Sequence, residues 1–565
     1  MPQNPNVVNK DNLKIRSKRK TGSWTWIALA VASIFAFPIL NVISAGFTTK
    51  SDVWDHLVST VLENYLINTS VLAIGVGILV AIIGTGTAWL VTMCRFPGHR
   101  FFEWALILPL AVPAYVMAYT YTDFLQVSGP VQAMIRDVFS VEFKEYWFPE
   151  VRSMGGAILM LSLVLYPYVY MLARAAFLEQ SVCALEVSRT LGCSAWGSFF
   201  RVALPLARPA IIGGTSLALM ETLADFGTVS FFGVQTFTTG IMNAWTNMGD
   251  LPAARQLSTY LLLFILTVFV LEKVSRGRSK YHHATNRYQN LPDYRLKGLK
   301  SFLAICSCAL PLFLGFLLPA IILVDMTLSL GDEQFGPKFF RLAFNSFTLA
   351  AVTAFTAVII GVFLAYTNRM QPNIISKWAT RIASMGYAVP GTVVAIGTLF
   401  PLAVLDNSFD AWMRATFDIS TGLLLTGSIA ALVFAYLVRF LAVSLNTVES
   451  GLGKIRPSME DASRTLGLGP LKTLWQVHIP IMSGSLMTAG LVVFVDVMKE
   501  LPATLVMRPF NFDTLAVHAY NLASDERLSQ SSTASLTIVL VGILPLILLT
   551  RAISKSRAGS QQGKT

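Results

Sequence analysis

The sequence has 565 residues, of which 54% are hydrophobic and only 13% carry a formal charge. A water-soluble domain carries about 25% charged residues, so this composition excludes a mainly soluble protein and predicts that most of the chain lies in lipid. The formal net charge is +12, but no folded domain outside the apolar segments is expected to present a basic surface. That excludes a nucleic-acid-binding protein, and no nucleic acid is expected among the partners.

The first half of the chain begins with a basic tail and continues with apolar stretches. Residues 1–23 form the tail, which we expect to be cytoplasmic. An uncharged segment of about 20 residues crosses a hydrocarbon core of about 30 Å as a helix. In the first half, residues 24–271, we expect spans near residues 24–46, 66–94, 104–124, 155–177, 209–231 and 257–271.

A basic linker, residues 272–301, precedes a second series of apolar stretches. The second half, residues 302–550, has expected spans near residues 302–324, 344–367, 382–404, 421–445, 484–507 and 533–550. Residues 551–565 form another basic tail. Lys and Arg concentrate on the cytoplasmic side of membrane proteins. About twelve spans, six in each half, place both tails and the linker on one side, so we predict cytoplasmic termini.

A short polar pattern occurs once in each half. Ser188-Arg-Thr-Leu-Gly192 recurs unchanged as Ser463-Arg-Thr-Leu-Gly467, and a proline follows each glycine by thirteen positions, at an offset of 275 between the copies. A repeat at fixed spacing indicates two homologous six-helix halves. The two loops, residues 180–209 and 455–484, are predicted to lie on the cytoplasmic side.

The residues of these loops are typical of a short helix that contacts another protein. A glycine can turn the chain where a Cβ would be strained, a proline fits the start of the following helix, and an acid just before a short helix suits its positive end. An ordinary interfacial helix that re-enters the bilayer is the alternative, and the duplication disfavours it. The candidate residues are Glu186, Ser188, Arg189, Gly192, Pro205, Asp461, Ser463, Arg464, Gly467 and Pro480.

Each half also places two acids inside a predicted span. Glu221 and Asp225 correspond to Asp496 and Glu500 at the same offset. Residues four apart lie on one face of a helix, and ionisable groups inside a bilayer normally face a cavity or one another. Gly227 and Pro502 interrupt the helices two residues beyond the outer acids, which is typical of a translocation site.

Two interpretations of the acids remain open. Carboxylate oxygens suit a hard cation such as Fe³⁺, which makes the acids candidates for a translocation pathway. Alternatively, they form interhelical ion pairs that hold or gate the outer end, with Lys499, Arg255 or Arg508 as partners. No metal site is firmly assigned. Near the outer end of the third span, Tyr115, Tyr119 and Tyr121 favour an interfacial aromatic belt.

The repeated loop resembles the "EAA" loop of permease subunits in bacterial binding-protein-dependent ABC importers. The departures are Val187-Ser188 and Ala462-Ser463 in place of two alanines, and Asp461 in place of Glu. The resemblance implies an all-α integral membrane protein with the type I ABC importer permease fold, in the bacterial inner membrane. It also implies that each loop couples the pore to a homodimer of cytoplasmic ATPases, which drives alternating access.

Four further stretches resemble the ferric-iron branch of these importers, at residues 220–229, 231–240, 496–505 and 508–516. They imply that ferric iron is carried after delivery by a periplasmic ferric-binding protein. Thiamine, a polyamine or an organophosphonate are the alternative substrates within the same class. An ion-coupled secondary transporter that uses the four acids as a proton relay is the alternative of another class.

The sequence contains no GxxxxGK[ST] phosphate-binding loop. Hydrolysis of ATP is therefore expected from a separate subunit, which would bind ATP and Mg. We expect this chain to be a permease rather than an enzyme, to bind no cofactor, and to have membrane lipid, the ATPase and the binding protein as its partners.

Overall fold

A computed structural model describes residues 22–48, 51–142, 145–179, 195–276, 294–330 and 335–556. These residues are almost entirely helical. Eleven of the helices are long and apolar enough to cross a membrane, or up to twelve if one bent pair counts as a single span. The prediction of an all-α membrane protein with about twelve spans is confirmed.

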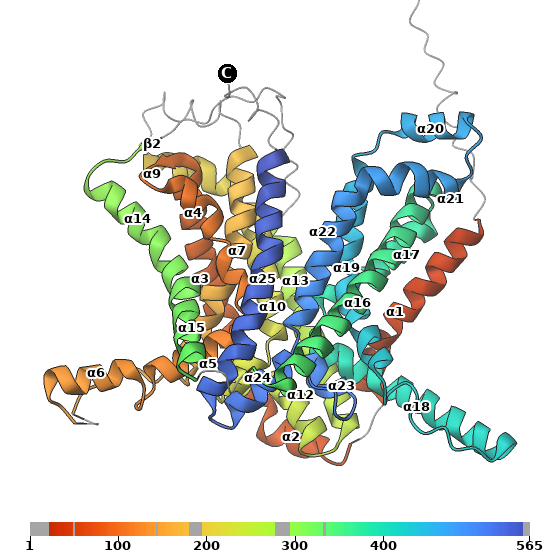
Figure 1. Cartoon of the computed structure of the whole chain (residues 1–565), viewed down its shortest axis with the longest axis horizontal. Helices are drawn as coiled ribbons and strands as arrows, with labels where there is room; N and C mark the ends of the chain where they lie inside the picture. The colour runs from red at the N-terminus through yellow and green to blue at the C-terminus, as the bar shows by residue number, and fades with distance from the viewer. Residues whose placement is uncertain are drawn as a thin grey trace, which may run out of the picture.

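In the first half the helices follow the order of the predicted spans (Figure 1). They are α1 (Ser23–Thr48), α2 (Trp54–Thr60), α3 (Leu62–Met93), α4 (His99–Ala105), η2 (Leu108–Ala111), α5 (Ala114–Leu125), α6 (Pro130–Phe139), α7 (Met154–Glu179), α9 (Ala195–Ser198), η3 (Phe199–Ala203), α10 (Leu204–Ala224), α11 (Gly227–Phe231), α12 (Phe237–Thr246) and α13 (Leu251–Arg276).

The second half repeats this order. Its helices are α14 (Leu299–Leu312), η4 (Phe313–Leu317), α15 (Leu318–Leu330), α16 (Pro337–Met370), α17 (Ile374–Ala383), η6 (Met385–Ala388), α18 (Gly391–Phe417), α19 (Ile429–Gly453), α20 (Pro457–Thr465), α21 (Pro470–Thr473), η7 (Leu474–His478), α22 (Ile479–Met498), α23 (Pro502–Met507), α24 (Leu515–Ser524) and α25 (Leu528–Ser556).

The first span of each half packs against the other half. Helix α1 contacts α17 and α18, whereas α14 contacts α3 and α4, and α15 contacts α5. Strand β2 (Tyr294–Arg295), just before α14, pairs in parallel with β1 (Cys94–Arg95) at the end of α3. Figure 1 shows the exchange, with α1 beside α16 and α17 and α14 beside α3 and α4. The two sequence halves therefore form one interlocked bundle.

The helices converge at one end and diverge toward the other. The converging end carries α12, α23 and α24, and the diverging end carries α9, α20 and α21 (Figure 1). Large apolar side chains on the outside, such as Ile27 on α1 (52% exposed) and Phe355 on α16 (71% exposed), remain uncovered by protein. Such a surface suits lipid rather than water.

The third predicted span of each half, near residues 104–124 and 382–404, is broken. In the first half the helix pair His99–Ala111 and Ala114–Phe139 bends by 90°, and the break falls at Pro113. The residue before a proline avoids the helical region, and Val112 and Val389 both have extended ψ values, of 117° and 128°. Helix α18 then continues to Phe417, well beyond the predicted end at residue 404.

The prolines of the repeated loops do not start new spans. A five-residue π-helical turn directly precedes the first turn of α10, which holds Pro205, and the same turn precedes α22, which holds Pro480. The spans run without interruption over Phe199–Ala224 and Pro470–Met498. A proline has no backbone N–H to donate to a helical hydrogen bond. A local π turn changes the pattern of backbone hydrogen bonds around the proline. Pro205 and Pro480 thus lie in the first turns of α10 and α22, which confirms the expected position at a helix start, and the π turn joins each helix to the preceding residues of the same span.

Candidate functional site

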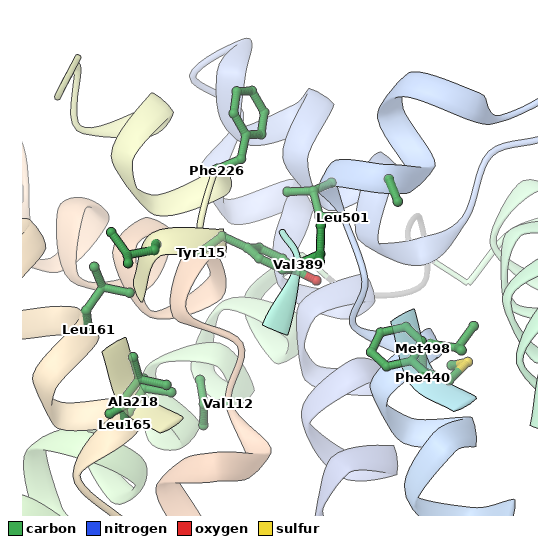
Figure 2. Packing of buried hydrophobic residues seen from close by; sticks show 14 of the residues in the cluster. Val112, Tyr115, Leu161, Leu165, Ala218, Phe226, Val389, Phe440, Met498 and Leu501 are labelled. Atoms are coloured by element: carbon green, nitrogen blue, oxygen red, sulfur yellow. The ribbon is translucent and has the colours of Figure 1, made fainter. Parts of the chain in front are cut away.

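The four predicted acids come together in one cavity at the converging end of the bundle. Glu221, Asp225, Asp496 and Glu500 all line a cavity of about 110 Å³. Apolar side chains from both halves surround it, among them Leu161 and Leu165 of α7 and Phe440 of α19 (Figure 2). The duplication thus predicted which residues share a site, although each pair comes from a different half of the chain.

The outer acid of each pair is not on the helix of the inner acid. Helix α10 ends at Ala224 and Asp225 is already extended, with φ −67° and ψ 134°. Helix α22 ends at Met498, before Glu500. The expected arrangement on one helix face is therefore wrong, because both helices end inside the motif.

Each outer acid instead accepts hydrogen bonds from the next short helix. Asp225 Oδ2 accepts from the backbone N–H groups of Thr228 and Val229, both at 3.1 Å. Glu500 Oε1 accepts from the Ala503 N–H at 3.3 Å. Carboxylates at such positions satisfy helix N–H groups that have no partner within the helix. The breaks therefore fix the orientation of Asp225 and Glu500 toward the cavity.

An arginine that the sequence analysis passed over is the main partner of the acids. Arg439 lies in α19, 7% exposed, with Nη1 2.5 Å from Glu500 Oε2 and Nη2 3.6 Å from Glu221 Oε2. A Cβ on Gly391 would lie 2.3 Å from Glu500 Oε1 and 2.8 Å from Arg439 Nη1, so a side chain at this position would displace the ends of this pair. A charged residue inside a span is costly, and the lone arginine in residues 421–445 was the signal that could have found it.

The predicted partners of the acids are right in one case of three. Lys499 Nζ lies 3.0 Å from Asp496 Oδ1. Arg508 pairs with Asp513, and Arg255 donates to Asn41 Oδ1 at 2.7 Å, so neither reaches the cavity acids. Among the described residues Asp225 forms hydrogen bonds but no ion pair. Four carboxylates and two cationic side chains line the cavity, which gives it an acidic balance.

The three tyrosines do not form an interfacial belt. Tyr115 and Tyr119 are 5% and 2% exposed, and the Tyr121 hydroxyl donates to the Leu314 carbonyl at 2.6 Å. Tyr115 lines the acid cavity, and Figure 2 shows it near Val389 and Leu501. The belt interpretation is wrong because the break at Pro113 directs this segment into the bundle instead of along its surface.

The second repeated loop forms a short helix at the diverging end of the bundle. Helix α20 ends at a turn in which the Leu468 N–H donates to the Ser463 carbonyl at 3.0 Å. Gly467 has φ +77° in this turn, which confirms the prediction that glycine turns the chain there. Ser463 is buried, and its hydroxyl lies 3.0 Å from Thr473 Oγ1 of α21, which joins the two short helices.

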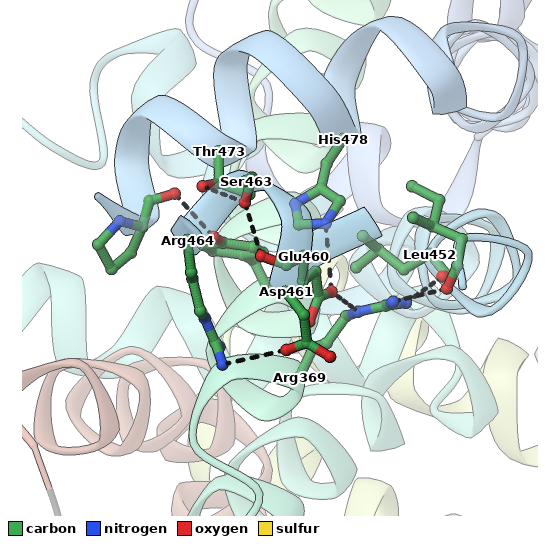
Figure 3. A network of polar contacts seen from close by, with 11 residues as sticks. Arg369, Leu452, Glu460, Asp461, Ser463, Arg464, Thr473 and His478 are labelled. Atoms are coloured by element: carbon green, nitrogen blue, oxygen red, sulfur yellow. Dashed lines mark hydrogen bonds and ion pairs between the residues drawn. The ribbon is translucent and has the colours of Figure 1, made fainter. Parts of the chain in front are cut away.

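The acid that anchors this loop is Glu460 rather than Asp461. Asp461 lies in the middle of α20, because the helix begins at Pro457, and its side chain is 73% exposed and 3.8 Å from Arg464. The expectation of an acid just before the helix is wrong for this copy. Glu460 pairs with Arg369 at the end of α16, and its Oε1 lies 3.2 Å from Nε2 of buried His478 (Figure 3).

Arg369 also holds the end of α19. Its guanidinium donates to the carbonyl of Leu452 and, at 2.7 Å, to that of Ile455. One arginine of α16 therefore connects α19 and α20, while His478 of η7 packs against the same carboxylate (Figure 3). We name Arg369, Glu460 and His478 the loop anchor. A movement of α20 would be transmitted through it to three spans.

Half of the first repeated loop, residues 180–194, lies outside the described residues. Glu186, Ser188, Arg189 and Gly192 are among these, whereas Pro205 is described in α10. The roles predicted for the loop residues and the acids stay predictions.

Comparisons with known proteins identify the family. The family described as "Binding-protein-dependent transport system inner membrane component" matches residues 16–280 and 357–558. The Fe(3+)-transport system permease protein FbpB 2 of Haemophilus influenzae is 25% identical over 93% of this chain and 96% of its own. The ferric transport system permease protein FbpB of Actinobacillus pleuropneumoniae is 23% identical over 89% of this chain and 73% of its own.

Relatives with other substrates match a smaller part of the chain. The molybdenum transport system permease protein ModB of Escherichia coli is 30% identical over 34% of this chain and 85% of its own. A solved bacterial alginate ABC transporter, in complex with a periplasmic protein, matches 45% of this chain at 14% identity with a TM-score of 0.35. The family match covers both halves of the chain and follows their duplication. The chain therefore belongs to the inner-membrane components of binding-protein-dependent transport systems, as a multi-pass permease of an ABC importer.

Proposed function

We propose that this permease carries ferric iron, delivered by a periplasmic ferric-binding protein, across the inner membrane. The observation that supports this best is the cavity in which four carboxylates outnumber two cationic side chains. Such a lining favours a cation over an oxyanion, and oxygen donors suit hard cations. The two ferric-transport relatives described above match most of this chain, whereas ModB matches about a third.

The proposed orientation has the chain termini, the linker and α20 in the cytoplasm. The acid cavity then lies toward the periplasm, where the helices converge, and the diverging end faces inward (Figure 1). A homodimer of ATPases, which binds ATP and Mg, would hold α20 and the corresponding loop of the first half. Closure of that dimer would move both loops and switch the cavity between the two sides. The permease itself would need no cofactor.

Asp225 offers the cleanest test of iron passage, because it forms no ion pair among the described residues. We expect Asp225→Asn to lower the rate of ⁵⁵Fe³⁺ uptake by about tenfold, the equivalent of roughly 1.4 kcal/mol in a barrier. The carboxylate of Asp225 would contact iron directly. The amide oxygen of asparagine would still accept the hydrogen bonds from the Thr228 and Val229 N–H groups, but without the charge. Uptake is measured in cells or proteoliposomes that contain the binding protein and the ATPase.

The comparison variant is Asp513→Asn, which neutralises an acid that lies outside the acid cavity. Normal iron uptake by Asp225→Asn, at equal protein level and equal ATP hydrolysis, would remove this residue from the pathway. Competition by molybdate, sulfate, thiamine, a polyamine or a phosphonate, with no uptake of iron, would overturn the proposed substrate and leave the importer class unaffected.

The loop anchor leads to a prediction about coupling. Arg369→Met should remove the ion pair with Glu460 and the hydrogen bonds to the carbonyls of Leu452 and Ile455. The loss is expected to be large, because hydrogen bonds to charged groups contribute about 1.5–3 kcal/mol each. We expect the chain to insert normally while α20 becomes sensitive to protease and uptake per ATP hydrolysed falls by about tenfold or more. Arg381→Met, which removes an exposed arginine of α17, is the matched control. Equal protease resistance and equal coupling in the two variants would contradict a mechanical role for the anchor.

A further inference from the structure

A second cavity with basic walls lies at the converging end of the bundle, away from the acid cavity. It has a volume of about 180 Å³ and lies between α16, α24 and α25. Its polar lining comes from Lys338, His518, Arg527 and Gln530, with no acid among the lining residues. Among the described residues, no hydrogen bond or ion pair engages these four side chains.

The electrostatics of this cavity favour an anion. Helices α16 and α25 both begin beside it, at Pro337 and Leu528, and helix N-termini carry a partial positive charge. Burial lowers the pKa of the His518 imidazole to about 4, with further lowering from Lys338 and Arg527. At neutral pH His518 is thus an uncharged donor between two cations, an arrangement suited to phosphate oxygens.

The surroundings of the cavity place it at the lipid boundary. Phe340 and Phe344 on α16 follow Lys338 by less than two turns and are 62% and 69% exposed. Leu328 on α15, a helix that packs against α25, is 76% exposed. Large apolar side chains in this position on membrane-spanning helices contact acyl chains. A lipid whose phosphate lay in the cavity would therefore have its acyl chains along α16.

We propose that this cavity binds the phosphate group of an anionic phospholipid in the leaflet at the converging end. Cationic pockets between membrane helices recognise such head groups. The basic lining is not repeated in full in the first half, where Glu63 occupies the position that corresponds to Lys338. Lipid bound here would fix α24 and the start of α25 relative to α16 on one side of the pore only. The proposal does not depend on which solute is transported.

The test compares lipid retention by the purified full-length chain and by the double variant Lys338→Gln/Arg527→Gln. Native mass spectrometry after exchange into detergent with added phosphatidylglycerol should find one lipid retained by the wild-type chain and lost in the double variant. Phosphatidylglycerol should also raise the thermal unfolding temperature of the wild-type chain, and phosphatidylcholine should not. Arg341→Gln, which removes an exposed charge one turn along α16 without lining the cavity, should keep both responses.

Three other results would overturn the proposed lipid site. Stabilisation by inorganic phosphate alone, equal to that by phosphatidylglycerol, would assign the site to free phosphate and overturn the lipid. Equal lipid retention by the wild-type chain and the double variant would refute the site. Destabilisation of the chain by Asp332→Asn/Glu333→Gln, equal to that by the basic variant, would mean that acids of this chain neutralise the basic side chains. That result would also overturn the proposal.

Discussion

Replacement of Arg439 by methionine is expected to destabilise the chain by about 3–5 kcal/mol, the usual cost of removing one partner from a buried ion pair. Glu500 is 6% exposed and would be left without its counter-ion at 2.5 Å. Glu221, whose carboxylate lies 3.6 Å from the same arginine, would then repel Glu500 without a cation between them. Thermal unfolding in detergent and ⁵⁵Fe³⁺ uptake at equal protein level measure the two consequences, and uptake should be lost.

The double variant Arg439→Met/Glu500→Met separates stability from transport. Apolar side chains of similar size commonly replace a buried ion pair without loss of stability. We therefore expect the double variant to regain most of the stability of the wild-type chain without regaining uptake. A single variant as stable as the wild-type chain would show that Glu500 is not held by Arg439. Full uptake by the double variant would show that the pair is neither gate nor pathway.

The sequence predicted the acid cavity more accurately than the local geometry around it. Fixed spacing identified Glu221, Asp225, Asp496 and Glu500 as a set, because duplicated halves place equivalent residues around a common axis. Arg439 was not predicted as a site residue because it has no counterpart at the 275-residue offset, where the first half has Val164. A search based on symmetry does not find a group that breaks the symmetry.

Helix ends were the second weakness of prediction from sequence. Apolar segments give the length of a span, but a span that breaks at Pro113 or ends at Ala224 has the same composition as a continuous one. The direction of Tyr115 and of Asp225 depends on these breaks, so neither could be derived from periodicity. Similarly, α20 begins earlier than expected, which exposes Asp461 and turns Glu460 into the anchor.

The anchor also makes the two repeated loops unequal. Arg369, Glu460 and His478 correspond at the 275-residue offset to Cys94, Leu185 and Ala203. None of these can reproduce the ion pair of the second half. The shared SRTLG pattern indicates that both loops meet the same kind of partner, whereas the residues behind it differ. We therefore expect substitutions in the loop of the second half to affect coupling more strongly.

Gly467→Val is the substitution expected to affect that coupling most. Gly467 has φ +77°, and a Cβ there would meet no atom within 4 Å. The effect therefore comes from the backbone conformation, which costs about 1–2 kcal/mol for a residue with a Cβ and more for a β-branched one. To relieve the strain, the turn that ends α20 would open and α20 would change its direction relative to α21. We expect the chain to insert normally and to lose ATPase association and uptake.

Two neighbouring substitutions isolate the conformational cause. Gly469 also has open space around it but a φ of −72°, so Gly469→Val adds the same side chain without the strain and should retain most of the uptake. Gly467→Asn should retain more than Gly467→Val, because asparagine tolerates the left-handed region. Loss of uptake in Gly469→Val as well would mean that bulk, not backbone conformation, disturbs the loop. Normal ATPase association and uptake in Gly192→Val/Gly467→Val would contradict the docking role of both loops, because this double variant alters the shared pattern in both copies at once.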